Sequence, residues 1–208
     1  MGLDGYLARQ FGRPSGLGGW AVGIAMNRQN RPMYEEAIRA LSPSGSDRVL
    51  DIGCGNGYVL RMLAERFGCS LAGIDISESA IRAASRRNRG PVRGERMTLS
   101  CGDMAAMPFE DGSFSKACTV NTVYFWDDPE GAMAEVGRVL EPGGVFVNVF
   151  YTGDFLARLP HTRHGYREYA VERLAAAGEG AGFETEARPI LGGDAWCVAH
   201  RKAEGLRR

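Results

Sequence analysis

The chain has 208 residues, enough for one sizeable α/β domain and too few for two ordinary ones. Its 25 basic and 25 acidic residues balance, so the overall charge gives no reason to expect a nucleic acid or an anionic membrane as partner. The five scattered cysteines form no C-x-x-C pair, which argues against a zinc site or a disulfide framework and favours a reducing cytoplasm. Because no apolar run reaches about 18 residues, no membrane span is expected, and no export leader is recognised.

The first 41 residues are expected to form a helical cap or lid. Residues 11–20 make a glycine-rich loop, and residues 32–41 have the spacing of a helix with Pro32 in its first turn. Such glycine-jointed aromatic segments can close over a ligand, although a purely structural cap on the core is the alternative. The side chains that would supply apolar surface are Tyr6, Phe11, Trp20, Met26 and Tyr34.

The stretch VLDIGCGNG, from Val49 to Gly57, is the one around which the chain is organised. A short apolar run ends in the carboxylate of Asp51, three glycines alternate with other residues, and residues 58–67 follow with helical spacing. This pattern predicts a strand, a tight turn and a helix. Glycine allows positive φ and lets the backbone lie close to a ligand.

Two kinds of ligand compete for this turn. A dinucleotide fingerprint, G-x-G-x-x-G, needs its third glycine at position 58, where the chain has Tyr58. The carboxylate of Asp51 would repel a phosphate but suits a ligand that carries an ammonium group. The turn therefore favours an adenosyl ligand with a cationic group, and a glycine turn with no ligand is the remaining alternative.

Two more strands end near carboxylates. Residues 71–75 form a strand that ends at Asp75, about twenty residues beyond the glycine turn, where an acidic side chain can hold ribose hydroxyls. A helix over residues 78–87 follows, and residues 97–100 form a third strand with Asp103 just after it. Because ligands of doubly wound sheets lie beyond the carboxyl ends of the strands, the three carboxylates are expected to face one crevice.

The second half of the chain continues this alternation. The predicted elements are strands at 118–123 and 145–150, helices at 129–140 and 166–177, and a closing antiparallel hairpin of strands at 185–190 and 196–200. Residues 201–208 have the composition of a frayed tail. Six arginines between residues 82 and 96 are interpreted as a solvated face, with a phosphate-bearing or nucleic-acid substrate as the alternative.

Taken together, these motifs resemble the class I S-adenosylmethionine-dependent methyltransferases of the small-molecule type. The likeness rests on VLDIGCGNG at 49–57, GIDIS at 73–77, CGDM at 101–104, MPF at 107–109, DGSF at 111–114 and EVGRVLEPGG at 135–144. Their order matches over residues 48–150, and the closing hairpin extends the likeness to about residue 200. The chain departs from the pattern at Ser115, where an aspartate is usual, and it lacks the Asn-Pro-Pro-Tyr motif of amino-methylating enzymes after Asn121.

The resemblance implies an α/β, Rossmann-like, doubly wound sheet of seven strands in a single domain. The strand order would be 3-2-1-4-5-7-6, with strand 7 antiparallel. Residues 42–200 would form the methyltransferase domain, between the lid at 1–41 and the tail at 201–208. The implied cofactor is S-adenosyl-L-methionine, with S-adenosyl-L-homocysteine as product, and no metal is expected. The expected partner is a small-molecule acceptor rather than a nucleic acid, and the protein would be a cytoplasmic monomer or homodimer.

The resemblance also assigns roles to single residues. Asp51 and the turn would hold the methionine portion, Asp75 the ribose, and Ile76 one face of adenine. Asp103 and the Met104 amide would hold the adenine edge. The complete implied set is Asp51, Gly53, Cys54, Gly55, Asp75, Ile76, Gly102, Asp103, Met104 and Asn121.

Methyl transfer mainly requires a nucleophile held in line with the S–CH₃ bond, at about 3 Å and away from water. A general base is needed only if the acceptor is a hydroxyl that stays protonated. The candidates by position are Tyr124, Asp127, His161 and His164, none of them compelling. Aromatic residues in the leader and near residues 124–155 suit a small aromatic or isoprenoid-like acceptor, whose reacting atom stays open among O, C and N. The alternatives are a non-catalytic cofactor-binding protein of the same fold or an NAD(P)-dependent oxidoreductase.

Overall fold

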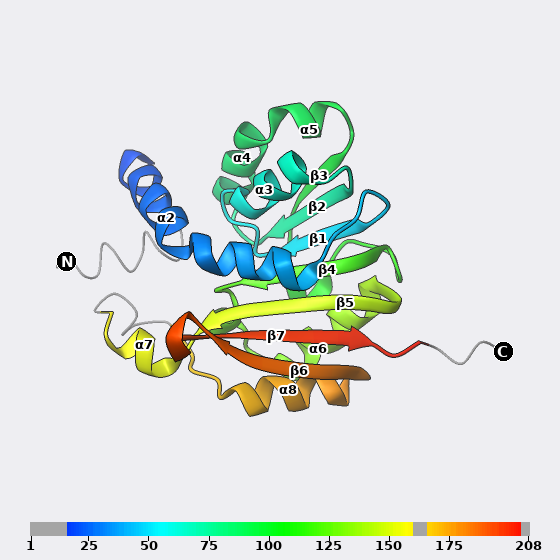
Figure 1. Cartoon of the computed structure of the whole chain (residues 1–208). Coiled ribbons are helices and arrows are strands. Elements are labelled where there is room, and N and C mark those ends of the chain that lie inside the picture. Colours follow the sequence, from blue (N-terminus) through cyan, green and yellow to red (C-terminus); the bar gives the residue numbers. More distant parts are fainter. Residues whose placement is uncertain (1–15, 160–165, 205–208) are drawn as a thin grey trace.

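The computed structural model describes residues 16–159 and 166–204, with side chains from residue 26 onward. Within these residues, seven strands form one sheet in the order β3-β2-β1-β4-β5-β7-β6 (Figure 1). β7 is antiparallel to both β5 and β6, and the other neighbours are parallel. The predicted fold class, strand order and antiparallel closing strand are therefore confirmed. The strands are β1 Arg48–Ile52, β2 Ser70–Asp75, β3 Met97–Cys101, β4 Phe114–Val120, β5 Leu140–Tyr151, β6 Phe183–Ile190 and β7 Ala195–Lys202.

Helices cover both faces of the sheet. Right-handed crossovers from β1 outward to β3 place α3 and α4 on one face, and those from β4 to β5 place α6 on the other. The helices are α2 Gly16–Leu41, α3 Tyr58–Arg66, α4 Glu78–Arg87, α5 Arg89–Arg93, α6 Pro129–Val139, α7 Gly153–Ala157 and α8 Val171–Gly180. α2 packs against β4, β5 and α3 (Figure 1). No helix in the described part of the chain has the length and hydrophobicity needed to cross a bilayer.

The N-terminal helix is longer than its sequence pattern predicts. The prediction began it near Pro32, whereas α2 runs from Gly16 to Leu41 with Pro32 inside it. Proline inside a helix removes one backbone hydrogen bond and bends the axis, and α2 bends along its length in Figure 1. The helix continues past the proline because its C-terminal part is anchored: Met33, Ala37 and Leu41 are almost completely buried in the core.

β4 begins and ends earlier than predicted. It spans Phe114–Val120 instead of residues 118–123. The start of the strand was missed because its first residues are polar. Ser115 accepts a hydrogen bond from the Arg48 amide at 3.0 Å, and Lys116 donates to the Leu41 carbonyl at 2.8 Å. The strand ends where Asn121 takes a left-handed conformation with φ 59°. That conformation turns the chain at the edge where a ligand is expected.

The helix predicted at residues 166–177 begins later, at Val171. Residues 166–170 have no regular secondary structure, and their aromatic side chains pack on the chain that follows β4. The Tyr166 ring lies 5.2 Å from that of Tyr124, and the Tyr169 hydroxyl donates to the Trp126 carbonyl at 2.7 Å. These tyrosines therefore have the spacing of a helix but serve tertiary packing before the helix begins.

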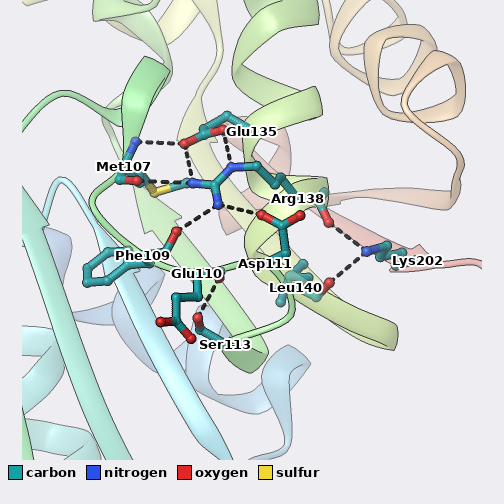
Figure 2. A network of polar contacts seen from close by, with 10 residues as sticks. Met107, Phe109, Glu110, Asp111, Ser113, Glu135, Arg138, Leu140 and Lys202 are labelled. Atoms are coloured by element: carbon teal, nitrogen blue, oxygen red, sulfur yellow. Dashed lines mark hydrogen bonds and ion pairs between the residues drawn. The ribbon is translucent and has the colours of Figure 1, made fainter.

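One arginine anchors the long connection between β3 and β4. Figure 2 shows Arg138 of α6 donating to the carbonyls of Met107 and Phe109, at 3.0 and 2.7 Å, and pairing with Glu135 and Asp111. Glu135 also accepts from the Met107 amide at 2.6 Å. In the same view Lys202 of β7 donates to the carbonyls of Gly137 in α6 and Leu140 at the start of β5, and β7 ends at Lys202, two residues beyond the strand predicted at 196–200.

Candidate active site

The glycine turn after β1 is held by its own hydrogen bonds. The amides of Gly53 and Cys54 both donate to the Ile74 carbonyl of β2, at 2.8 and 3.0 Å. The Gly55 amide donates to a carboxylate oxygen of Asp75 at 2.9 Å, and the Gly57 amide donates to the Cys54 carbonyl at 2.8 Å. Four amides are thus satisfied within the protein, and the turn is formed before any ligand arrives.

The three glycines of this turn serve different purposes, although all have positive φ. A Cβ at Gly53 would collide with the Thr122 side chain, and one at Gly57 would lie 2.6 Å from Asn88 and 3.0 Å from the Cα of Ala84. At Gly55 nothing lies within 4 Å of the same position. The backbone of Gly55 therefore borders open space, which is where a ligand could approach closely.

Asp51 is the most unusual group at this edge of the sheet. Its side chain is buried, and Oδ2 has no hydrogen-bond partner within the described part of the chain. Burial, followed by repulsion from Asp75, raises the pKa of this carboxyl to about 8. A buried carboxylic oxygen without a partner is costly to maintain, and a cationic group beside it would remove that cost.

Asp75 lies at the end of the neighbouring strand. One of its oxygens accepts from the Gly55 amide and the other from the Ser77 amide, each at 2.9 Å. Each oxygen keeps a second lone pair, so the carboxylate can still accept from hydroxyl groups. Ile76, the next residue, is 66% exposed, and such an apolar side chain beside the turn suits a flat ring.

β3 delivers the third carboxylate to the same edge. Asp75 is the register partner of Cys101, and the Gly102 amide donates to the Asp75 carbonyl at 3.1 Å. Asp103 follows directly and is exposed, and its Oδ1 accepts from the Ala105 amide at 2.9 Å. This bond caps the short helical turn Met104–Ala106, which sets the direction of the Met104 backbone.

Asn121 and Tyr124 lie beyond β4 on the opposite side of the glycine turn. The Tyr124 hydroxyl donates to the Asn121 side chain at 3.0 Å and accepts from the Tyr151 amide at 2.6 Å. Burial raises the pKa of the Tyr124 phenol well above its ordinary value. This environment keeps the proton on Tyr124 and gives it the task of positioning Asn121 rather than that of a base.

The other candidate bases have less support from the geometry. Asp127 is exposed and forms an ion pair with Arg167. His161 and His164 lie outside the described residues, as do Tyr6, Phe11 and the side chain of Trp20. The structure therefore brings the predicted cofactor residues to one edge of the sheet, and neither Tyr124 nor Asp127, the two candidate bases that it describes, is placed to act as a base.

α2 contributes polar residues that the sequence interpretation missed. Asn27 shares a hydrogen bond of 3.4 Å with Asn56 of the glycine turn. Asn30 accepts from the Tyr151 hydroxyl at 3.1 Å, and the Asn121 side chain donates to the sulfur of Met33 at 3.4 Å. Both asparagines are buried, and buried amides need partners, but the polar stretch NRQNR at 27–31 in which they stand gave no sign of this burial. α2 therefore lies over the carboxyl ends of β1, β4 and β5.

Comparisons with known proteins agree with this geometry. Residues 50–148 match a family model described as "Methyltransferase domain". The chain is 30% identical over 148 residues to the 24-methylenesterol C-methyltransferase 2 of Oryza sativa subsp. japonica, which covers 71% of this chain and 41% of that protein. A solved geranyl diphosphate methyltransferase in complex with SAM superposes with a TM-score of 0.71, 19% identity and 93% coverage of both chains. The cyclase SpnF gives 0.69, with 20% identity and coverage of 84% of this chain and 82% of that one.

These matches are of two kinds. The solved structures are under 25% identical and speak for the fold alone, and SpnF shows that this fold is not restricted to proteins named as transferases. The chain spans less than half of the length of the first curated relatives, 41% for the rice protein. The family match over residues 50–148 covers the glycine turn and the three strand-end carboxylates. Residues 50–148 therefore match the methyltransferase-domain family, and the relatives and solved neighbours support the class I, S-adenosylmethionine-dependent type.

Proposed function

We propose that this chain binds S-adenosylmethionine at the carboxyl edge of its sheet and transfers the methyl group to a small-molecule acceptor. The observation that carries the proposal is Asp51, whose buried and unpartnered oxygen lies beside the glycine turn. An amino-acid ammonium group is the cation that this position suits. The similar proteins include a methylenesterol C-methyltransferase and a geranyl diphosphate methyltransferase, whose names support a small acceptor.

The residues present suit each part of this cofactor. Asp51 would neutralise the ammonium group, and the open backbone of Gly55 would border the ligand. Asp75 would accept from the ribose hydroxyls, because both of its oxygens retain a lone pair. The exposed Ile76 would cover one adenine face, and Asp103 with the Met104 amide would hold the adenine edge.

The catalytic contribution of the chain is mainly positioning. When bound, S-adenosylmethionine supplies a methyl group that its sulfonium already activates for displacement. The preformed turn and the buried asparagines of α2 would hold the ligand in one orientation and exclude water, which is the kind of effect that can lower a barrier by about 7–11 kcal/mol. Because Tyr124 keeps its proton and no other described residue is placed as a base, we expect an acceptor that needs none, such as an anion, a free amine or an activated carbon.

The surroundings of the site suit an apolar acceptor. Phe125 is half exposed and lies 5.2 Å from the Tyr166 ring, and Phe155 stacks on Tyr151 at 4.2 Å. These aromatic groups lie beyond the ends of β4 and β5, on the side of Asn121. We therefore propose a small aromatic or isoprenoid-like metabolite.

A calorimetric titration with S-adenosylhomocysteine tests the cofactor assignment. Asp75→Ala removes an acceptor of ribose hydroxyls and also frees the Gly55 and Ser77 amides, so affinity should fall by about 1–3 kcal/mol, or roughly 5- to 150-fold. Glu184→Ala, an exposed carboxylate on β6, is the matched control and should leave the dissociation constant unchanged. An unchanged constant for Asp75→Ala would refute the ribose role.

Methyl uptake by phenols, quinone precursors, isoprenoids and amines then tests transfer. Tight binding of S-adenosylhomocysteine without turnover of any acceptor would favour a non-catalytic binding protein. Stabilisation by NAD(P) and not by S-adenosylhomocysteine would instead favour an oxidoreductase. Either result would overturn the proposal.

A further inference from the structure

A second pocket lies beside the glycine turn, on the side away from Asn121. It has a volume of about 230 Å³ and lies between α2, α3 and α4. Its lining consists of Asn27, Arg28, Arg31, Tyr58 and Arg87. Three arginines, one tyrosine and one asparagine thus line a single cavity, and none of the described residues that line it is acidic.

The positive charges of this pocket are poorly compensated. Arg28 and Arg87 form no ion pair with any described residue. Arg31 lies 3.8 Å from Glu35, but both oxygens of that carboxylate are held by Arg66, at 2.5 and 2.7 Å. Guanidinium groups gathered without acids repel one another, and an anion between them removes the repulsion.

Arg87 is the least exposed of the three arginines. Its guanidinium lies 5.3 Å from the centre of the Tyr58 ring, and Tyr58 in turn packs against Tyr34 at 5.6 Å. Partial burial, together with the nearby charge of Arg61, lowers the pKa of Arg87, which shows that the position disfavours an isolated positive charge. A guanidinium that lies over an aromatic ring is restrained by it, and arginine is the side chain best suited to recognise a phosphate group.

The connection with the glycine turn is direct. Asn27 reaches the turn through Asn56, and Tyr58 is the first residue of the helix that the turn starts. A group bound in this pocket would therefore touch the same segment as the cofactor while lying outside the crevice of the three carboxylates.

We propose that this pocket binds a phosphate or diphosphate group separately from the cofactor. The group could belong to the acceptor or to a free anion, since the chemistry that recognises it is the same. Arg28 and Arg31 would provide mobile charge and Arg87 an oriented pair of donors. Binding at this site does not depend on the proposed methyl transfer.

Calorimetry with inorganic pyrophosphate, on protein saturated with S-adenosylhomocysteine, tests the site. The intact chain should bind pyrophosphate with a dissociation constant that rises with ionic strength. The double variant Arg28→Gln/Arg31→Gln and the single variant Arg87→Gln should each bind at least about tenfold more weakly, because charge-assisted hydrogen bonds are lost. Each variant should keep the Tm of the intact chain.

Two matched controls separate the pocket from general charge effects. Arg39→Gln changes an arginine of α2 that pairs with Glu36, and Arg82→Gln changes one of α4 that pairs with Glu78. Both should bind pyrophosphate as the intact chain does. The proposal is overturned if the intact chain shows no binding at millimolar pyrophosphate, if the pocket variants bind as tightly as the controls, or if saturating S-adenosylhomocysteine displaces the anion.

A second arm identifies the source of the anion. Methyl uptake is measured with an isoprenyl diphosphate and with the corresponding isoprenyl alcohol. If the acceptor supplies the phosphate, Arg28→Gln/Arg31→Gln should raise KM for the diphosphate and leave KM for the alcohol unchanged. If neither compound is methylated while pyrophosphate binds, the site serves a free anion, and the proposed transfer is judged separately by the titration with S-adenosylhomocysteine alone.

Discussion

At the scale of single residues, Asp51 couples ligand binding to protonation. In the free protein the carboxyl holds its proton up to a pH of about 8, because burial and then Asp75 disfavour the charge. An ammonium ligand favours the ionised form, so the complex holds fewer protons than the free protein. Affinity for S-adenosylhomocysteine should therefore rise with pH between about 6 and 8, by up to about tenfold per pH unit.

This dependence is measured by titrations at several pH values and in two buffers of different ionisation enthalpy, which report the released proton. Asp51→Asn keeps the shape of the side chain but cannot ionise, so it should bind more weakly at pH 8 and show no pH dependence. A dissociation constant of the intact chain that is flat between pH 6 and 8 would contradict the assignment.

Gly55 and Gly57 allow a ligand contact to be separated from a packing requirement. Alanine at either position costs about 1 kcal/mol, because both have left-handed φ. At Gly57 the new methyl group also meets Asn88 and the backbone of Ala84, whereas at Gly55 it enters open space. Gly57→Ala should therefore lower Tm clearly more than Gly55→Ala does.

For ligand affinity the order of the two variants should be reversed, with Gly55→Ala affected more than Gly57→Ala. Gly55→Ala should lose at least about tenfold in affinity for S-adenosylhomocysteine while remaining folded. Normal binding by Gly55→Ala would show that the ligand does not approach this part of the turn.

At the scale of elements, Arg138 connects α6 to the segment between β3 and β4. Arg138→Met leaves the carbonyls of Met107 and Phe109 without their donor and removes two carboxylate partners (Figure 2). Because the side chain is partly exposed, water can replace some of these bonds, and the expected loss of unfolding free energy is about 2–3 kcal/mol. Urea unfolding measures it.

The matched control is Arg82→Met, which breaks an exposed pair with Glu78 and should cost less than about 0.5 kcal/mol. Arg138→Met should also weaken binding of S-adenosylhomocysteine, since the segment that it anchors begins next to Asp103. Equal stability losses for the two variants would contradict a special role for Arg138.

The elements show how far sequence patterns reach. The strands rich in apolar residues and the helix at 78–87 were predictable, and Ser77 caps that helix, α4, by accepting from the Ala80 amide. The predicted start of β4 was too late because Ser115 and Lys116 are polar. Their polar groups bond to distant parts of the chain, the Arg48 amide and the Leu41 carbonyl. The hydrophobic pattern within one segment carries no information about such distant partners. The predicted strand and helix boundaries were therefore wrong where tertiary hydrogen bonds determine them.

The candidate site was predictable to a similar degree. Carboxylates at strand ends are local features, and parallel topology brings Asp51, Asp75 and Asp103 to one edge. The contributions of α2 were missed because they depend on distant hydrogen-bond partners. Asn27 bonds to Asn56 and Asn30 to Tyr151, both far away in the sequence. The protonation of Asp51 is likewise a consequence of packing.

At the scale of the whole molecule, two buried groups far apart in the sheet shape the response to pH. His200 of β7 is fully buried; its Nδ1 lies 2.9 Å from the Thr185 hydroxyl and its ring stacks on Phe146. Burial lowers the pKa of His200 to about 4, below the ordinary value of 6.5. The unfolded chain therefore holds one more proton here between pH 4 and 6.5, and this stability is lost as the pH falls through that window.

Asp51 has the opposite sign. Its folded pKa of about 8 lies above the unfolded value of about 3.9, so the free folded protein holds one more proton between these values and loses stability as the pH rises. Between pH 4 and 6.5 the two contributions cancel. Above pH 6.5 the contribution of His200 is complete, and through Asp51 the free energy of unfolding should fall by about 1.4 kcal/mol per pH unit up to pH 8.

Urea unfolding of the free protein from pH 4.5 to 8 tests this balance with two variants. Asp51→Asn should remove the decline above pH 6.5, and His200→Gln should expose the Asp51 slope between pH 4.5 and 6.5, where the intact chain is level. Because the slope and not the absolute stability is compared, a packing loss at Gly178, which adjoins His200, does not disturb the reading. A His200→Gln profile parallel to that of the intact chain would show that His200 is not the group that opposes Asp51.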